Sequence, residues 1–165
     1  VKSANVRIRP GGILQVDVTP RIPVAVWRHA DGISIVDAGG AHVAAIASRM
    51  AFPQLPLIVG EGAARHVPEA LNLLRIAGAL GERVRGIVRM GNRRWDVVLD
   101  RDQRIMLPES GAQAALERVI APERAEDVLT RDVARVDLRI PERPTIRMTD
   151  DAIETWWQIR QKTDE

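Results

Sequence analysis

The chain has 165 residues, a formal net charge of +2 and no cysteine. This length is sufficient for a hydrophobic core without metal or disulfide support, and the lack of cysteine excludes zinc ribbons, thiol catalysis and disulfide frameworks. Arginines are interleaved with acidic residues between positions 82 and 104, so no long basic run can follow a phosphate backbone and nucleic-acid binding is disfavoured. The sequence has no apolar run of roughly 18 residues, the length that indicates a membrane-spanning helix.

The first part of the chain predicts a hairpin followed by a break. Two short extended runs, Val6–Arg9 and Ile13–Val18, flank a Pro-Gly-Gly turn signal. Two prolines then interrupt the pairing, because proline cannot donate a hydrogen bond to a strand ladder. Pairing is expected to resume at residues 24–27, and we place a domain boundary near Arg28.

Short strands and one long helix are predicted next. Ile33–Val36 reads as a strand, followed by a loop that extends to Pro56 and a short buried strand over Leu57–Val59. Leucines and alanines then recur at helical spacing. The predicted helix begins near Pro68, which the first turn tolerates, and ends at Gly81, where glycine acts as a stop.

Residues 83–107 predict a meander of three strands. Each strand alternates apolar and charged residues, which predicts one packed face and one solvent-exposed face. In this scheme Arg89 and Asp96 lie on the solvent side. A second helix is predicted over Ala112–Ile120, and a helical turn over residues 122–129.

The C-terminal part predicts a closing hairpin and a helical tail. Alternating residues indicate a hairpin over Val136–Thr149, with a proline-bounded loop at its turn. The tail from Asp150 is expected to form one more helix. For Trp156 and Trp157 we favour packing on the domain over a partner or membrane anchor, because tryptophan is buried more often than not. The elements together predict an α+β fold: a β-rich domain with a mixed or antiparallel sheet and two main helices.

No catalytic machinery is recognisable. A metal site is disfavoured because four candidate ligands match no known ligand spacing: His29, Asp31, Asp37 and His42. Gly60-Glu61-Gly62 follows a strand and precedes a helix, as a phosphate loop does, but Glu61 would repel an anion and we favour a tight turn. No serine lies in a nucleophile motif. We predict no enzymatic activity and no cofactor.

Several segments occur in an order that resembles the extracytoplasmic part of the bacterial FtsQ/DivIB cell-division family: Asn5–Pro10, Pro23–Trp27, Leu55–Gly60, Arg94–Leu99 and Val136–Arg139. The likeness extends almost to Thr149, and Val-Asp-Leu-Arg before the final strand is its most specific motif. The arginine-rich, lysine-poor composition is similar to that of alphaproteobacterial members.

The resemblance implies a polypeptide-transport-associated (POTRA) domain followed by a β domain. It makes residues 1–28 the closing hairpin of a truncated POTRA domain, 29–149 an FtsQ-type β domain and 150–165 a C-terminal tail. A hairpin without its helices cannot cover its apolar face, so we expect it to be loosely ordered, swapped onto a neighbour or merged with the sheet of the β domain. The implied location is the periplasmic face of the inner membrane at the division septum. Because the chain starts at Val1 without a signal peptide, we expect the membrane anchor upstream.

The implied function is that of a divisome scaffold. Such a scaffold binds the small single-span proteins FtsB and FtsL by strand addition at its last strand, and so influences septal peptidoglycan synthesis. The partner contacts that the resemblance implies are Arg93, Leu138, Ile140, Thr145, Ile146, Arg147 and Met148. Ile140 and Met148 stand where the family can place aromatic residues, which weakens aromatic anchoring.

Other interpretations remain open at this point. The last strand could already be covered by the tryptophan-containing tail, or be an ordinary edge protected by prolines and arginines. For the whole chain, one alternative is a POTRA-type chaperone or assembly module for envelope proteins. Another is a hydrolase, which a bound metal or a cluster of perturbed carboxylates would support.

Overall fold

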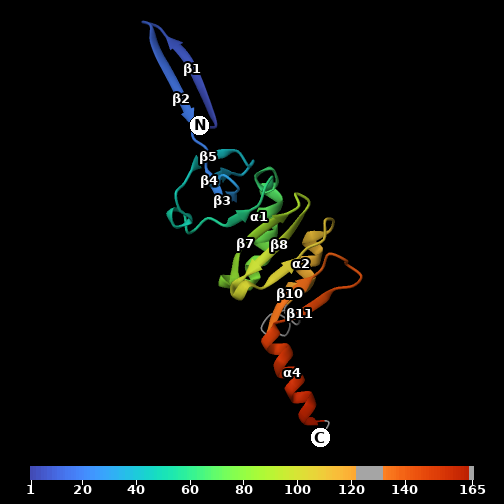
Figure 1. Cartoon of the computed structure of the whole chain (residues 1–165). Coiled ribbons are helices and arrows are strands. Elements are labelled where there is room, and N and C mark those ends of the chain that lie inside the picture. The colour runs from blue at the N-terminus through green and yellow to red at the C-terminus, as the bar shows by residue number, and fades with distance from the viewer. Residues whose placement is uncertain (122–131, 164–165) are drawn as a thin grey trace.

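The computed structural model describes residues 1–121 and 132–163. The helical turn predicted over residues 122–129 lies outside the described residues. The molecule is elongated, with a separate hairpin at one end, a large sheet with two helices in the middle and a third helix at the other end (Figure 1). This mixture of strands and helices agrees with the predicted α+β class.

Nine strands form one mixed sheet. They are β3 (Pro23–His29), β4 (Gly32–Asp37), β5 (His42–Ala45), β6 (Leu57–Val59), β7 (Val84–Met90), β8 (Arg94–Leu99), β9 (Arg104–Met106), β10 (Val133–Asp137) and β11 (Thr145–Met148). Their order across the sheet is β11-β10-β9-β8-β7-β6-β3-β4-β5. The pairs β3–β6, β6–β7 and β9–β10 are parallel, and the other neighbours are antiparallel.

Two helices pack side by side on one face of this sheet, α1 (Val67–Ala77) and α2 (Ala112–Ile120). Both were predicted, and α2 has the predicted bounds. Short 3₁₀ turns connect the elements: η1 (Arg49–Ala51), η2 (Ala63–His66), η3 (Gly78–Arg83) and η4 (Asp100–Asp102). α1 ends at Ala77, four residues before the predicted end at Gly81, and the chain continues as η3. Within η3, the positive φ of 59° at Gly81 lets the chain turn toward β7.

The main core lies between the helices and the sheet. The largest side chains that are fully buried there include Trp95, Ile58, Leu73, Ile87, Leu99, Ile105, Leu107 and Leu116. They come from the helical spacing of α1 and α2 and from alternate positions of the central strands. Burial of these side chains supplies most of the driving force that holds the sheet and helices together.

The predicted faces of the meander are wrong in part. Arg89 is 8% exposed and points toward the helices, and Asp96 is 1% exposed, so neither lies in solvent. A register shift between Val84 and Gly86 in β7 reverses the alternation after that point. A Cβ on Gly86 would lie 2.8 Å from the Leu57 carbonyl oxygen, so only glycine fits this close approach to β6.

The segment after the Gly39-Gly40 turn contains a strand that the sequence did not predict. His42–Ala45 forms β5, which pairs with β4 at the edge of the sheet opposite β11. Most of its residues are exposed, so it lacks the apolar alternation by which a strand is recognised. A tertiary partner, β4, determines this element rather than its own composition.

The N-terminal hairpin consists of β1 (Ser3–Arg9) and β2 (Ile13–Thr19), which pair only with each other. It is not merged with the large sheet, so this one of the three expected arrangements is wrong. Several of its apolar side chains are exposed, namely Val6, Ile8, Ile13, Leu14, Val16 and Val18. Residues 23–28, which the sequence interpretation grouped with the hairpin, form most of β3 and pair inside the large sheet.

The tail forms the predicted helix, α4 (Asp150–Thr163). It extends away from the sheet, beyond the end of β11 (Figure 1). Trp156 is 47% exposed and Trp157 is 54% exposed, so the expected packing of these side chains on the domain is wrong. The reason is geometric: the helix leaves the sheet directly after its edge strand, where no other described element faces it.

Candidate functional site

β11 is the edge strand of the large sheet and contains four of the predicted contact residues. It pairs on one side with β10, antiparallel, and has no neighbour on the other side among residues 1–121 and 132–163. All of its residues are exposed: Thr145, Ile146, Arg147 and Met148. An edge strand presents unpaired N–H and C=O groups that can accept another strand. The tail leaves this strand exposed, so the alternative of a covered edge is wrong.

The backbone of β11 has a definite inner and outer side. The N–H of Thr149, just after the strand, donates to the carbonyl oxygen of Asp132 at 2.7 Å. Backbone groups of successive strand residues point to opposite sides of the strand. The groups of Arg147 therefore face β10, as do those of Thr145. The N–H and C=O of Ile146 and Met148 face away from the sheet and form the free edge.

An apolar hollow lies beside this edge on the helix side of the sheet. Its volume is about 230 Å³, and it lies between α2 and the hairpin formed by β10 and β11. The side chains that line it include Val119, Val136, Leu138, Pro144 and Ile146. Ile146, on the β11 side of the hollow, is 52% exposed. A strand that pairs with β11 would direct every second side chain toward this side.

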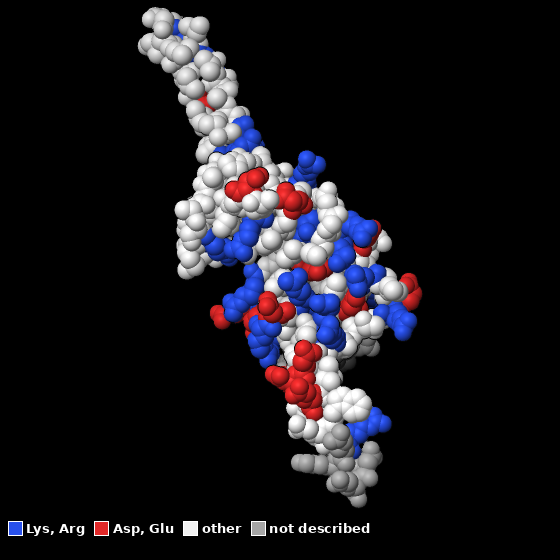
Figure 2. Space-filling model, in the orientation of Figure 1, with Lys and Arg blue, Asp and Glu red and all other residues white. Residues whose placement is uncertain are grey.

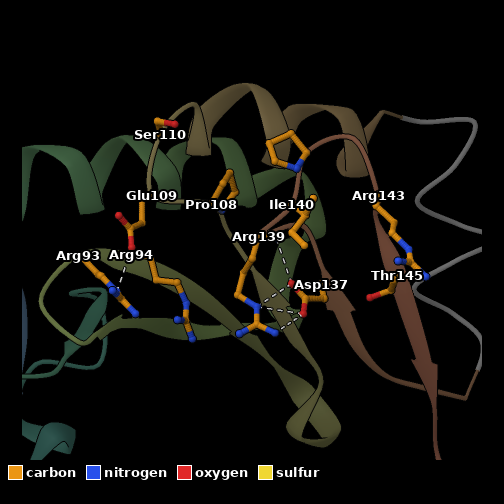
Figure 3. A pocket seen from close by; sticks show the side chains of 11 residues that line it. Arg93, Arg94, Pro108, Glu109, Ser110, Asp137, Arg139, Ile140, Arg143 and Thr145 are labelled. Carbon is orange, nitrogen blue, oxygen red and sulfur yellow. Dashed lines mark hydrogen bonds and ion pairs between the residues drawn. The ribbon is translucent and has the colours of Figure 1, made fainter.

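A larger, charged hollow of about 680 Å³ lies near the turn of the same hairpin. Four arginines and two carboxylates line it: Arg93, Arg94, Arg139, Arg143, Glu109 and Asp137. Figure 3 shows Arg94 and Arg139 pointing to the same side of the sheet, with Arg143 and Thr145 farther along the β10–β11 hairpin that carries Arg139. Positive charge predominates, so the hollow is suited to a carboxylate of a bound protein.

Ion pairs fix part of this arginine-lined hollow. Arg139 Nε lies 2.9 and 3.0 Å from the two Asp137 carboxylate oxygens, and its Nη2 lies 2.6 Å from Oδ2. The hydrogen bond from Arg139 lowers the pKa of Asp137, and Asp137 raises the pKa of Arg139 in turn. Arg93 Nε contacts Glu109 Oε1 at 3.0 Å, with both side chains more than half exposed. Arg93 is thus held near the hollow by a weak surface pair.

Asp96 lies under the same face of the sheet. Burial raises the pKa of its carboxyl, while nearby Arg94 and Arg104 oppose that shift. Arg94 Nε lies 3.6 Å from Asp96 Oδ1, an oxygen that accepts no hydrogen bond from the described residues. The Asp96 carboxylate therefore attracts the Arg94 guanidinium and holds it in position at the arginine-lined hollow. The sequence interpretation missed this role because the alternation of β8 placed Asp96 in solvent.

The predicted contact residues outside β11 divide into two groups. Arg93 and Ile140 line the arginine-lined hollow together with Thr145, so the structure brings these three residues to one place. Ile140 is 60% exposed. Leu138 differs, because it is 6% exposed and forms part of the wall of the apolar hollow. Leu138 and Ile140 also lie beyond the end of β10 rather than inside the strand.

The glycine-containing loop between β6 and η2 is a tight turn, as the sequence indicated. Gly60 and Gly62 have positive φ angles of 114° and 70°. A Cβ on Gly60 would lie 2.6 Å from the Arg89 carbonyl oxygen. Glu61 accepts a hydrogen bond from the Ala30 N–H at 2.8 Å, which ties the loop to the end of β3. These contacts give the loop a structural role.

The four metal candidates do not form a ligand cluster. Asp37 instead accepts hydrogen bonds from Arg21 and from the Ala41 N–H. His29 Nε2 lies 3.3 Å from Ser34 Oγ and its Nδ1 lies 3.9 Å from Asp31. Ser34 is 3% exposed, so this imidazole and hydroxyl pair is closed to a substrate. Within 1–121 and 132–163, no group of three or more His, Cys, Asp or Glu could hold a metal ion.

None of the helices in the described part of the chain combines the length and apolar character needed to cross a bilayer.

Comparison with known proteins gives a consistent result. The family model "Cell division protein FtsQ/DivIB, C-terminal" matches residues 25–139. The chain is 63% identical to a protein named cell division protein FtsQ from Roseobacter litoralis over 161 residues, which cover 98% of this chain and 55% of the relative. It is 52% identical to the protein of that name from Paracoccus denitrificans over 148 residues, 90% of this chain and 44% of the relative. The chain spans about half the length of the curated relatives it matches.

Proposed function

The chain belongs to the FtsQ/DivIB family of cell-division proteins, and from this premise we propose that it is a non-catalytic scaffold that binds a partner by strand addition at β11. The proposed partners are FtsB- and FtsL-type division proteins. Through them the scaffold would help to control septal peptidoglycan synthesis. The observation that carries the binding mode is the free edge of β11, where Ile146 and Met148 direct their backbone groups away from the sheet.

The two hollows beside β11 support this mode of binding. An added strand gains affinity from backbone hydrogen bonds and specificity from pockets for alternate side chains. On the helix side, the apolar hollow next to Ile146 would take an apolar side chain of the partner. On the other side, the arginine-lined hollow next to Thr145 would take an acidic one. The expected partner segment is therefore extended and carries apolar and acidic residues on opposite faces.

Aliphatic side chains supply the contact area along this edge. Met148 is 41% exposed and Ile140 is 60% exposed, so both are available to a partner. Methionine adapts its shape to a neighbour, but neither side chain provides the rigid surface of an aromatic anchor. We therefore expect the backbone hydrogen bonds and the arginines to account for a larger part of the specificity.

The rest of the proposal concerns the longer protein. We propose that β1 and β2 form the closing hairpin of a POTRA domain, because their exposed apolar side chains need further elements to cover them. We also propose a location at the periplasmic face of the inner membrane, at the division septum, with an upstream transmembrane helix as the anchor. The length of the curated relatives, about twice that of this chain, leaves room for these parts.

The test is a calorimetric titration of the chain with the extracytoplasmic segment of an FtsB-type protein. Ile146→Pro removes one outward N–H and leaves the pairing with β10 intact, whereas Ile146→Val keeps the N–H and serves as the control. We expect Ile146→Pro to weaken binding by at least about tenfold, since a backbone hydrogen bond contributes about 0.5–1.5 kcal/mol and the proline ring obstructs the approaching strand. Unchanged affinity in a folded Ile146→Pro protein would rule out strand addition at β11.

A further inference from the structure

α4 carries an apolar face that no described element covers. Its exposed apolar side chains are Ile153, Trp156, Trp157 and Ile159, with exposed fractions of 37%, 47%, 54% and 61%. At 100° per residue, these positions fall on the same half of the helix as Ala152, and the acidic residues and Gln158 fall on the other half. Arg160 also falls on the apolar half, where its guanidinium covers part of the Trp156 ring. Isolated helices of this length are marginally stable in water. A helix that exposes two tryptophans therefore has the properties of an interface.

The helix is attached rigidly to the edge strand. Thr149 follows β11 directly, and its Oγ1 accepts a hydrogen bond from the Ala152 N–H at 3.3 Å. The Thr149 carbonyl oxygen accepts from the Ile153 N–H at 3.1 Å, while the Thr149 N–H donates to Asp132. Thr149 is thus the N-cap of α4. It is also the last residue after β11 whose backbone forms a hydrogen bond on the β10 side. No linker separates the proposed binding edge from the helix.

This attachment places one end of any added strand beside α4. A strand paired with the outer side of β11 has one end next to Met148, whether it runs parallel or antiparallel. The partner residues that adjoin this end must then pass the first turns of α4, where Ile153 and Trp157 are exposed. The free edge of β11 and the start of α4 are therefore within reach of a single bound chain.

We infer that α4 is the second half of the partner interface and binds the segment of the partner that flanks the added strand. This inference rests on the proposed function. The segment that fits carries apolar side chains for the exposed face of α4 and basic side chains where it meets the start of α4. Tryptophan is enriched among the residues that dominate binding energy, and α4 exposes two of them.

The charge of α4 selects a basic partner. Acidic side chains gather over its first turns (Figure 2), from Asp150, Asp151 and Glu154. Arg160 lies over the Trp156 ring, 5.1 Å from its centroid, and so does not reach the acidic end. Arg147 Nη2 lies 3.9 Å from Asp150 Oδ1, which leaves Asp151 and Glu154 as the carboxylates that a partner can contact. A membrane with anionic lipids would be repelled by these carboxylates. A flanking segment with lysine or arginine would be attracted by them.

The experiment uses two probes on the same chain: the whole extracytoplasmic segment of an FtsB-type protein, and a peptide trimmed to its strand. Trp157→Glu places a charge on the apolar face, and Gln158→Glu places the same charge on the adjacent polar face as the matched control. We expect Trp157→Glu to weaken the whole segment by about thirtyfold and the strand peptide by less than about twofold, with Gln158→Glu changing neither. If the thermal midpoint of the Trp157→Glu protein equals that of wild type, unfolding of the sheet is not the cause of the weaker binding.

The outcomes separate this inference from the proposed function. If Trp157→Glu leaves both probes unaffected while Ile146→Pro weakens both, α4 is not part of the interface and strand addition stands. If wild-type protein binds neither probe, strand addition fails and the inference fails with it. Dimerisation of the free chain that Trp157→Glu abolishes would assign α4 to a second copy instead. Binding to phosphatidylglycerol vesicles that Trp157→Glu abolishes would assign it to the membrane, and either result overturns the inference.

Discussion

Arg89 is the residue whose environment departs most from its position in the sequence pattern. Its side chain is 6% exposed, with Nη1 3.2 Å from Glu69 Oε2 and the guanidinium carbon 4.9 Å from the centre of the Trp95 ring. Its Nη2 also donates to the Asn92 carbonyl oxygen at 3.2 Å. Arg89 therefore joins α1, the end of β7 and the turn that leads to Arg94. Through this turn it supports the arginine-lined hollow.

Two substitutions at Arg89 distinguish what its volume contributes to stability from what its charge contributes. Arg89→Met keeps most of the volume, and Glu69 is exposed enough to be solvated, so we expect a change in unfolding free energy within about 1 kcal/mol. Arg89→Ala leaves a cavity beside Trp95 and should cost about 2 kcal/mol more. Urea denaturation of both variants measures the difference. Equal, large losses in the two variants would show that the ion pair, and not the packing, stabilises this region.

Asp37 gives a prediction about pH. The hydrogen bond from Arg21, and next the one from the Ala41 N–H, hold its pKa below the ordinary value of 3.8. A lowered pKa contributes stability above the unfolded value, and this stability is lost as the pH falls through the folded value. Asp37→Asn should therefore lower the thermal midpoint at pH 7, and the difference from wild type should shrink below about pH 4. A difference that is constant from pH 7 to pH 3 would contradict this linkage.

At the scale of single elements, the sequence predicted those with strong periodicity. α2 and β6 were predicted with their bounds, and α1 begins next to its predicted start but ends at Ala77 instead of Gly81. Their apolar spacing is regular, which is why the sequence indicated them. β5 was missed because it depends on pairing with β4. The faces of β7 were assigned wrongly because the register shift between Val84 and Gly86 appears only in the pairing of β7 with β8, which a single strand's pattern cannot reveal.

The proposed site was predictable only in part for the same reason. The edge residues 145–148 follow from a last strand with alternating residues. The arginine-lined hollow depends on the order of β8, β9, β10 and β11 across the sheet, which brings Arg94 and Arg139 together. The pair Asp137 and Arg139, two residues apart in the Val-Asp-Leu-Arg motif, was the one local signal. Their ion pair forms where the chain leaves β10 after Asp137.

The inner and outer sides of β11 give a prediction for proline substitutions. Arg147→Pro removes an N–H that faces β10 and should destabilise the β10–β11 hairpin by about 1–3 kcal/mol. Ile146→Pro removes an outward N–H and should change the stability of the free protein by less than about 1 kcal/mol. Denaturation of the two variants without any partner measures this contrast. Similar losses in both would mean that the assignment of sides is wrong.

At the scale of the whole molecule, the proposed interface and the N-terminal hairpin lie at opposite ends (Figure 1). The two-stranded hairpin pairs only with itself, and the sheet begins at Pro23. One end thus carries the proposed binding edge, and the other carries the hairpin that we propose to belong to a POTRA domain. The order of strands produces this arrangement, because β11 and β5 are the two edges of the sheet.

Removal of residues 1–19 tests this independence. The deletion keeps Arg21 and its contact with Asp37, so the large sheet loses no partner. We expect the thermal midpoint to change by less than about 2 °C, because the free energy of unfolding of the sheet should change by less than about 0.5 kcal/mol. Affinity for the FtsB-type segment should be unchanged. A large drop in the midpoint would show that the hairpin supports the sheet.

The central claim is that the outer backbone groups of β11 bind another chain, and amide hydrogen exchange measured residue by residue tests it most directly. In the free protein, the N–H groups of Ile146 and Met148 should exchange rapidly and that of Arg147 slowly, since only the latter faces β10. On addition of the FtsB-type extracytoplasmic segment, Ile146 and Met148 should become protected by about tenfold or more. Binding that leaves both amides exchanging as in the free protein would contradict strand addition at β11.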